Sequence, residues 1–172
     1  MRSVPDRAAA LLAPEAIRLD ARAGDRDEAV RVCGRVLVDT GAVEPGYVEA
    51  MLERERSVST YLGEGVAIPH GTNEGRGLIR RDALAVVRFP EGTDWNGHPV
   101  TVCIAIAARG GGHMEILAEL AEILMDPVRA RALREADEPE KVLALLAPRE
   151  EHPREEHPQS RQHRPTGQGH TV

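Results

Sequence analysis

The stretch ALAVVRFPEGTDWNGHPVTVCIAIA, residues 83–107, decides the fold class. Its two ends, 83–89 and 100–107, are apolar runs of strand length, and the residues between them are rich in turn formers. Residues 104–107 are apolar in succession, which is typical of a strand that is covered on both faces. Helices must therefore lie on both sides of this sheet.

The flanking sequence supplies those helices. Apolar residues recur at helical spacing from Asp27 up to a terminating Gly41, and a second helix is predicted from Pro45. After the strands, helices are predicted from His113, from Pro127 to about residue 135, and near 139–146. Short strands are expected at 17–21 and 66–68. The sequence thus predicts a single α/β sandwich in which helices flank a small mixed sheet.

The length of 172 residues suits one domain with a tail. Residues 148–172 repeat REEHP twice and add Gln, Ser, Gly and Pro without apolar spacing, so we predict a disordered tail there. The predicted organisation is an N-terminal extension at 1–9, a domain at 10–147 and the tail at 148–172.

Composition excludes several classes of function. A net charge of −6 and an aromatic content of 2% argue against nucleic-acid binding. Neither phosphate-loop nor dinucleotide-binding glycine motifs are present, so no cofactor is expected.

Cys33 and Cys103 lie far apart in the sequence, in apolar settings, and are predicted to be buried, reduced thiols. With no apolar run of membrane-spanning length, we expect a cytoplasmic protein that does not insert into the membrane.

Two histidines are candidates for chemistry. His70 ends a short apolar run and enters a glycine turn, so one ring nitrogen should be held by a hydrogen bond, which prepares an imidazole for nucleophilic attack. His113 follows three glycines at a predicted helix start, where the helix dipole keeps an imidazole neutral. From spacing alone, a structural histidine and a helix cap remain the alternative interpretations.

Arginines at the end of the second predicted helix offer charge for an anion. Arg54 precedes His70 closely enough to reach the same site, where its planar guanidinium would clamp a phosphoryl group. Arg56 is interpreted as a surface residue that complements the helix dipole. A zinc site built from His70, His98 and His113 is a separate hypothesis, but the spacings match no metal motif, so no metal is predicted.

The string STYLGEGVAIPHGT, residues 59–72, resembles the active-site segment of the enzyme IIA components of the phosphoenolpyruvate-dependent sugar phosphotransferase system, in the mannitol/fructose group. MLERE at 51–55 and IAARGGGHMEILAELAEIL at 106–124 resemble the same group in the same order. The similarity covers about residues 10–147, and the family has an α/β sandwich fold.

The resemblance implies a phosphotransferase component with a phosphohistidine intermediate. By this similarity His70 accepts a phosphoryl group from the phosphocarrier HPr and passes it to a cysteine of a IIB domain. Arg54 matches the arginine that stabilises the phosphoryl group, and His113 matches a second histidine that positions the first. Because the chain carries no IIB or IIC segment, the acceptor is expected to be a separate IIB or IICB mannitol permease component.

The subtype is predicted from shorter strings. TYLGE at 60–64 and FPEG at 89–92 resemble the mannitol IIA proteins, which favours transport of a sugar alcohol, with mannitol as the expected substrate. The nitrogen-regulatory IIA proteins share the core around the histidine and a later histidine, so a signalling role is the alternative. A histidine metal-binding protein is the more distant one.

Overall fold

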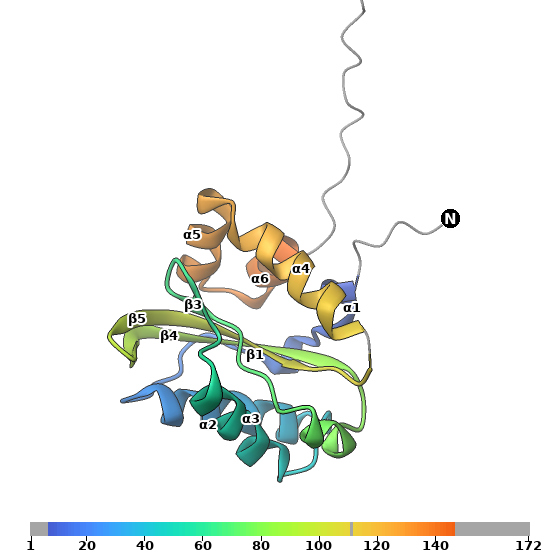
Figure 1. Cartoon of the computed structure of the whole chain (residues 1–172). Coiled ribbons are helices and arrows are strands. Elements are labelled where there is room, and N and C mark those ends of the chain that lie inside the picture. The colour runs from blue at the N-terminus through green and yellow to red at the C-terminus, as the bar shows by residue number, and fades with distance from the viewer. Residues whose placement is uncertain (1–6, 111, 147–172) are drawn as a thin grey trace, which may run out of the picture.

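A long antiparallel hairpin forms the centre of the protein. The computed structural model describes residues 7–110 and 112–146, and within them five strands form one sheet in the order β1-β4-β5-β3-β2 (Figure 1). β1 runs parallel to β4 and β3 parallel to β5, whereas β4 pairs antiparallel with β5 and β2 with β3. The strands are β1 (Ile17–Arg18), β2 (Tyr61–Gly63), β3 (Val66–Ala67), β4 (Ala83–Trp95) and β5 (His98–Ala107).

The central strands are longer than the sequence predicts. β4 continues past residue 89 through a register shift between Arg88 and Thr93, and the turn itself is only Asn96 and Gly97. Both turn residues have positive φ, at 54° and 91°, as a tight hairpin with right-handed strand twist requires. The apolar run at 104–107 is fully buried, as predicted for a strand covered on both faces.

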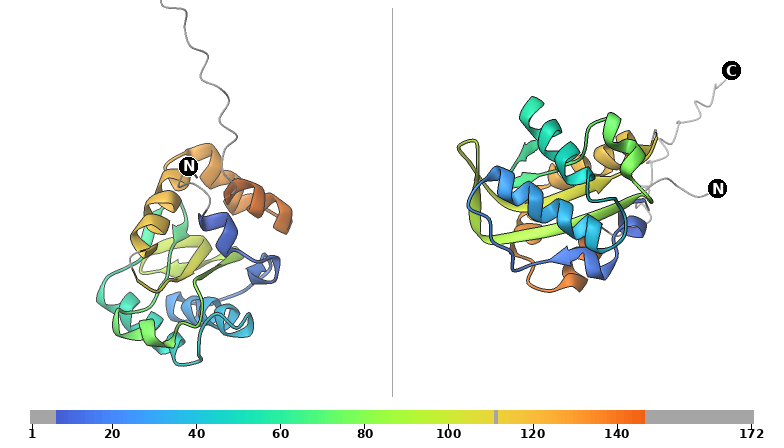
Figure 2. Two further views of the ribbon diagram at one scale, coloured as in Figure 1. Left: turned by 90° about the vertical axis from the view of Figure 1, so that its right-hand side faces the viewer. Right: turned by 90° about the horizontal axis from the view of Figure 1, so that it is seen from below.

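Helices cover both faces of the sheet. α2 (Arg26–Asp39) and α3 (Tyr47–Ser57) lie side by side across one face (Figure 2). The opposite face is covered by α4 (Gly112–Leu124), α5 (Pro127–Glu135) and α6 (Pro139–Leu146), with the short α1 (Arg7–Leu11) packed beside α4 and α6. Short 3-10 helices occupy Pro14–Ala16 and Glu74–Leu78. The predicted fold class, a sandwich around a small mixed sheet, is confirmed.

Local sequence signals set both ends of α2 and the start of α5. The side chain of Asp25 accepts a hydrogen bond from the backbone N–H of Glu28 at 2.8 Å and caps α2, and Gly41 beyond the helix has a φ of 76°. Pro127 begins α5 as predicted. The predicted start of α3 at Pro45 was wrong by two residues: the helix begins at Tyr47.

Both cysteines are free and buried, as predicted. Burial raises the pKa of the Cys103 thiol well above its usual range, and the neighbouring Cys33 thiol raises it further, so Cys103 stays protonated at neutral pH. The predicted tail at 148–172 lies outside the described residues. In the part of the chain that the structure describes, none of the helices is long and apolar enough to cross a membrane.

Candidate functional site

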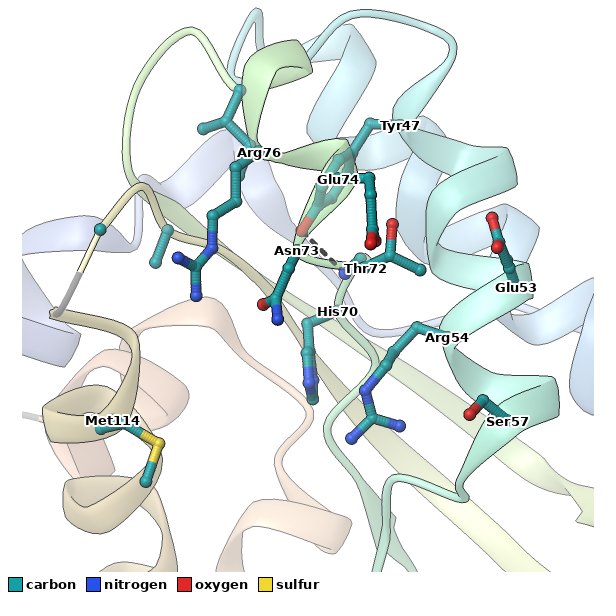
Figure 3. Close-up of a pocket in the computed structure, with 14 residues that line it drawn as sticks. Tyr47, Glu53, Arg54, Ser57, His70, Thr72, Asn73, Glu74, Arg76 and Met114 are labelled. Atoms are coloured by element: carbon teal, nitrogen blue, oxygen red, sulfur yellow. Dashed lines mark hydrogen bonds between the residues drawn. The ribbon is translucent and has the colours of Figure 1, made fainter.

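His70 lies where the chain leaves the sheet after β3. β3 runs parallel to β5, and the pairing continues past the strand as the backbone N–H of Ile106 donates to the carbonyl of Pro69 at 3.0 Å. His70 itself forms an isolated parallel bridge with Ile106. Only 8% of the surface of His70 is exposed to solvent. The backbone of His70 is therefore held by the central strand, while its ring extends into the pocket described below (Figure 3).

Hydrogen bonding fixes the tautomer of this imidazole. Nδ1 of His70 lies 2.9 Å from the carbonyl oxygen of Ile68, and because a carbonyl can only accept, Nδ1 carries the hydrogen. Nε2 is then the ring nitrogen with the lone pair. The predicted hydrogen bond to one ring nitrogen is thus present in the structure.

Burial sets the charge of the same ring. Desolvation lowers the pKa of His70 below its ordinary value of 6.5, and the nearby positive charge of Arg54 lowers it further. The hydrogen bond to Ile68 and the negative charge of Glu55 act in the opposite direction but do not cancel these effects. His70 is therefore neutral at neutral pH, which is the state in which imidazole is a nucleophile.

One face of α3 is turned toward the His70 segment. Tyr47, Ala50 and Arg54 follow one another at helical spacings of three and four residues, so they share that face. Arg54 is half-buried in the last turn, and its Nη1 donates to the carbonyl of Val58 at 2.7 Å. Figure 3 shows its guanidinium beside the His70 ring. The structure brings these two predicted site residues together.

The next residue, Glu55, was missed in the sequence. It is 2% exposed, and its carboxylate accepts hydrogen bonds from the Thr60 N–H at 2.9 Å, the Thr60 hydroxyl at 2.6 Å and the Trp95 indole N–H at 2.9 Å. Three donors satisfy this buried carboxylate. The two Thr60 donors tie the end of α3 to the segment that leads into the site, and the Trp95 donor ties it to the end of β4.

A pocket of about 660 Å³ opens over His70. Arg54 lies on one side of it and Arg76, from the 3-10 helix, on the other, and both guanidinium groups point inward (Figure 3). Thr72 and Asn73 add polar side chains to the lining between them. Arg76, Thr72 and Asn73 were not predicted, although their position within six residues of His70 in a glycine-rich loop was a usable signal.

The structure places the remaining histidines differently. His113 is the second residue of α4, whose first turn borders the pocket through Met114, but its side chain lies outside the described part of the structure. His98 begins β5, whereas the partner of His70 in the sheet is Ile106, eight residues or roughly 27 Å further along that strand. His98 instead stacks on Tyr61 with ring centroids 4.6 Å apart. The three histidines of the zinc hypothesis are therefore not brought together.

These features define an α/β protein whose pocket offers a neutral imidazole and two guanidinium groups to an anionic group. Comparison with known families gives a match over residues 10–148 to the model "Phosphoenolpyruvate-dependent sugar phosphotransferase system, EIIA 2". The chain belongs to this family. This family assignment agrees with the resemblance to the enzyme IIA proteins found in the sequence.

Curated relatives agree with that assignment. The mannitol-specific phosphotransferase enzyme IIA component of Halalkalibacterium halodurans is 38% identical over 136 residues, which cover 79% of this chain and 94% of the relative. A multiphosphoryl transfer protein of Xanthomonas campestris is 41% identical over 134 residues, or 77% of this chain. The chain spans only 16% of the length of that larger protein.

Solved structures share the fold. The crystal structure of mannitol IIA from Escherichia coli matches with a TM-score of 0.73 and 36% identity, covering 78% of this chain and 98% of the other. A complex of the E. coli mannitol IIA with phosphorylated mannitol IIB matches with a TM-score of 0.74 and 35% identity over 79% and 98% of the two chains. The nitrogen-regulatory IIA of Neisseria meningitidis has a TM-score of 0.71 but 27% identity, over 81% and 98%.

Proposed function

We propose that this chain is the phosphocarrier of a mannitol-type uptake system, with His70 as the residue that carries the phosphoryl group. The observation that carries the proposal is the neutral, Nδ1-bonded imidazole of His70 beside the guanidinium of Arg54. The donor is phosphorylated HPr, and the acceptor is the cysteine of a mannitol-type IIB domain. The protein acts in the cytoplasm.

Uptake of the phosphoryl group needs no proton transfer at His70. The Nε2 lone pair attacks the phosphorus of the phosphohistidine of HPr, the new N–P bond forms as the old one breaks, and the electron pair of the broken bond returns to the imidazole of HPr. The Nδ1 hydrogen stays in place and donates to the carbonyl of Ile68. Positive character that develops on the ring is then stabilised by that carbonyl.

Arg54 supports the phosphoryl group during this step. Phosphoryl transfer depends on in-line positioning and on stabilising the negative charge that spreads over the three phosphoryl oxygens. A guanidinium provides two parallel donors for such oxygens. Because Arg54 is also bonded to the carbonyl of Val58, its side chain is already ordered beside His70. His113 is assigned to positioning the phosphorylated ring, by its match to the family and its place in the first turn of α4.

In the second step the phosphoryl group passes from His70 to a sulfur atom of the acceptor. The thiolate of the IIB cysteine attacks the phosphorus, an S–P bond forms, and the electron pair of the N–P bond returns to Nε2. Both partners must bind the same face in turn and leave quickly, which favours a small, partly apolar surface. Val58, beside the pocket residue Ser57, is 61% exposed, and Met114 in the pocket rim is 70% exposed. These two side chains suit such a transient contact.

A regulatory role is the second candidate function. The nitrogen-regulatory IIA of N. meningitidis shares the fold, but its identity of 27% is lower than the 36% and 38% of the mannitol proteins. The strings at 60–64 and 89–92 also resemble mannitol IIA. These similarities favour the transport function over signalling.

Transfer to a IIB protein tests the transport function directly. The chain is charged with labelled phosphate from phosphoenolpyruvate, enzyme I and HPr, freed of HPr, and mixed with a mannitol-type IIB protein. We expect the label to move to IIB and to stay on this chain when the IIB cysteine is replaced by serine. Label that enters this chain but never reaches mannitol IIB would favour the regulatory function.

A further inference from the structure

Tyr47 is the buried polar residue that connects both sides of the His70 segment. Tyr47 is 2% exposed at the start of α3. Its hydroxyl donates to the carbonyl of Ile106 at 2.9 Å and accepts from the backbone N–H of Gly71 at 2.9 Å. The Tyr47 hydroxyl thus bonds to the backbone N–H of Gly71, the residue after His70, and to the backbone carbonyl of Ile106, the strand residue that pairs with His70.

The ring of Tyr47 fits this position closely. A Cβ added at Gly71 would lie 2.5 Å from the Tyr47 ring, closer than side chains approach one another. Gly71 is therefore required at this position because the aromatic ring lies against its backbone. The same ring borders Gly75 in the 3-10 helix, 3.7 Å from an added Cβ there. The Tyr47 ring therefore packs against two glycines of the loop that follows His70.

Burial keeps the hydroxyl in the form that makes both bonds. Desolvation raises the pKa of Tyr47 above 10.0, although the bond from Gly71 and the charge of Arg76 act against this change. The hydroxyl therefore keeps its hydrogen and donates to Ile106 throughout the physiological range. Tyr47 lines the pocket wall beside His70.

We propose that Tyr47 is a positioning residue for phosphoryl transfer: its hydroxyl holds Gly71 and Ile106 in register and thereby fixes the His70 ring for in-line attack. This inference rests on the proposed function of His70. It adds to that function a residue that touches neither the phosphoryl group nor the imidazole. Small displacements of a reacting group reduce phosphoryl transfer strongly, because the reaction depends on alignment.

Replacing Tyr47 with phenylalanine tests the proposal, because Tyr47→Phe keeps the ring and removes only the hydroxyl. We expect the first-order rate of phosphoryl uptake from saturating phospho-HPr to fall about tenfold, with an unchanged KM for phospho-HPr. The ring signals of His70 in nitrogen NMR spectra should broaden or shift. Tyr61→Phe, at the tyrosine that stacks on His98, is the matched control and should keep both the wild-type rate and the His70 signals.

A second control separates positioning from general loss of stability. Val30→Ala removes buried side-chain volume in α2, away from the pocket, and lowers stability without touching the site. The proposal is overturned if Tyr47→Phe takes up phosphate at the wild-type rate, or if Val30→Ala slows uptake as much as Tyr47→Phe does. If the wild-type chain takes up no phosphate at all, the proposed function of His70 fails, and this outcome differs from a specific failure of Tyr47.

Discussion

Nδ1 of His70 lies 2.9 Å from the carbonyl oxygen of Ile68, so one short backbone contact assigns the two ring nitrogens their different tasks. The nitrogen bonded to the carbonyl keeps its hydrogen, and the other has the lone pair that chemistry at this site requires. The contact depends on the backbone geometry that follows β3. The backbone just after β3 therefore sets the tautomer of the His70 imidazole.

The depressed pKa of His70 predicts how its charge depends on pH. Burial lowers the pKa below 6.5, so the ring stays neutral at pH 7 and takes up a proton only as the pH falls through that lowered value. An NMR titration of the ring, assigned with the His70→Ala variant, should show a midpoint below 6.5. A midpoint at or above 6.5 would contradict the described burial.

The same shift affects stability. An unfolded chain binds a proton at His70 with an ordinary pKa, whereas the folded chain resists protonation, so stability should decrease as the pH falls from about 6.5 through the lowered pKa of the folded state. Urea unfolding of wild type and His70→Ala at several pH values measures this contribution. A difference between the two proteins that does not change across that range would refute it.

Arg54 and Arg56 offer a matched pair of substitutions. Arg54 faces His70, whereas Arg56 lies 3.4 Å from Asp27 in a surface ion pair, in agreement with its interpretation as a surface residue. Arg54→Lys keeps the charge but loses the paired donors, and uptake of phosphate should slow about 100-fold. Arg56→Lys should match wild type in a rapid-quench assay. Equal rates for the two variants would remove Arg54 from the mechanism.

His113→Ala tests the second histidine. Because the residue is proposed to position the phosphorylated ring and not to carry the phosphate, the variant should still be phosphorylated by HPr. Its transfer to mannitol IIB should be slower in single-turnover experiments. His98→Ala is the control, since His98 is exposed at the far end of β5. Wild-type transfer by His113→Ala would exclude the proposed role.

The buried carboxylate of Glu55 should contribute to stability. In Glu55→Gln an amide group replaces one oxygen, so a donor faces the Thr60 or Trp95 donors and the strong charged hydrogen bonds are lost. We expect the free energy of unfolding to fall by about 1–3 kcal/mol. Urea titration followed by Trp95 fluorescence and circular dichroism measures it, with Glu49→Gln on the exposed side of α3 as control. Equal stability of the two variants would show that Glu55 makes no such contribution.

The fold was largely predictable because its main signals are local. The apolar runs of β4 and β5, the cap at Asp25 and the proline at the start of α5 each depend on a few neighbouring residues. The extension of β4 to Trp95 was not predictable in this way, because pairing with β5 maintains a strand through residues that resemble a turn. α1 was also missed, since five residues are too few to show a period.

The site was only partly predictable, for the same reason. His70 and Arg54 stood out by residue type and by their match to the family. Tyr47 did not, because its role depends on Ile106, 59 residues away, and on a hydrogen bond between α3 and the central strand β5. Glu55 follows Arg54 in a charged run that resembles a solvated helix end, and only its partner Trp95, 40 residues away, explains its burial.

Phosphorylation of His70 is the central claim, and intact-mass analysis tests it most directly. Wild type and His70→Ala are incubated at neutral pH with phosphoenolpyruvate, enzyme I and HPr, and circular dichroism verifies that both are folded. The account predicts that wild type gains a single acid-labile phosphoryl group and that His70→Ala gains none. An equal gain in His70→Ala, or no gain in either protein, would contradict it.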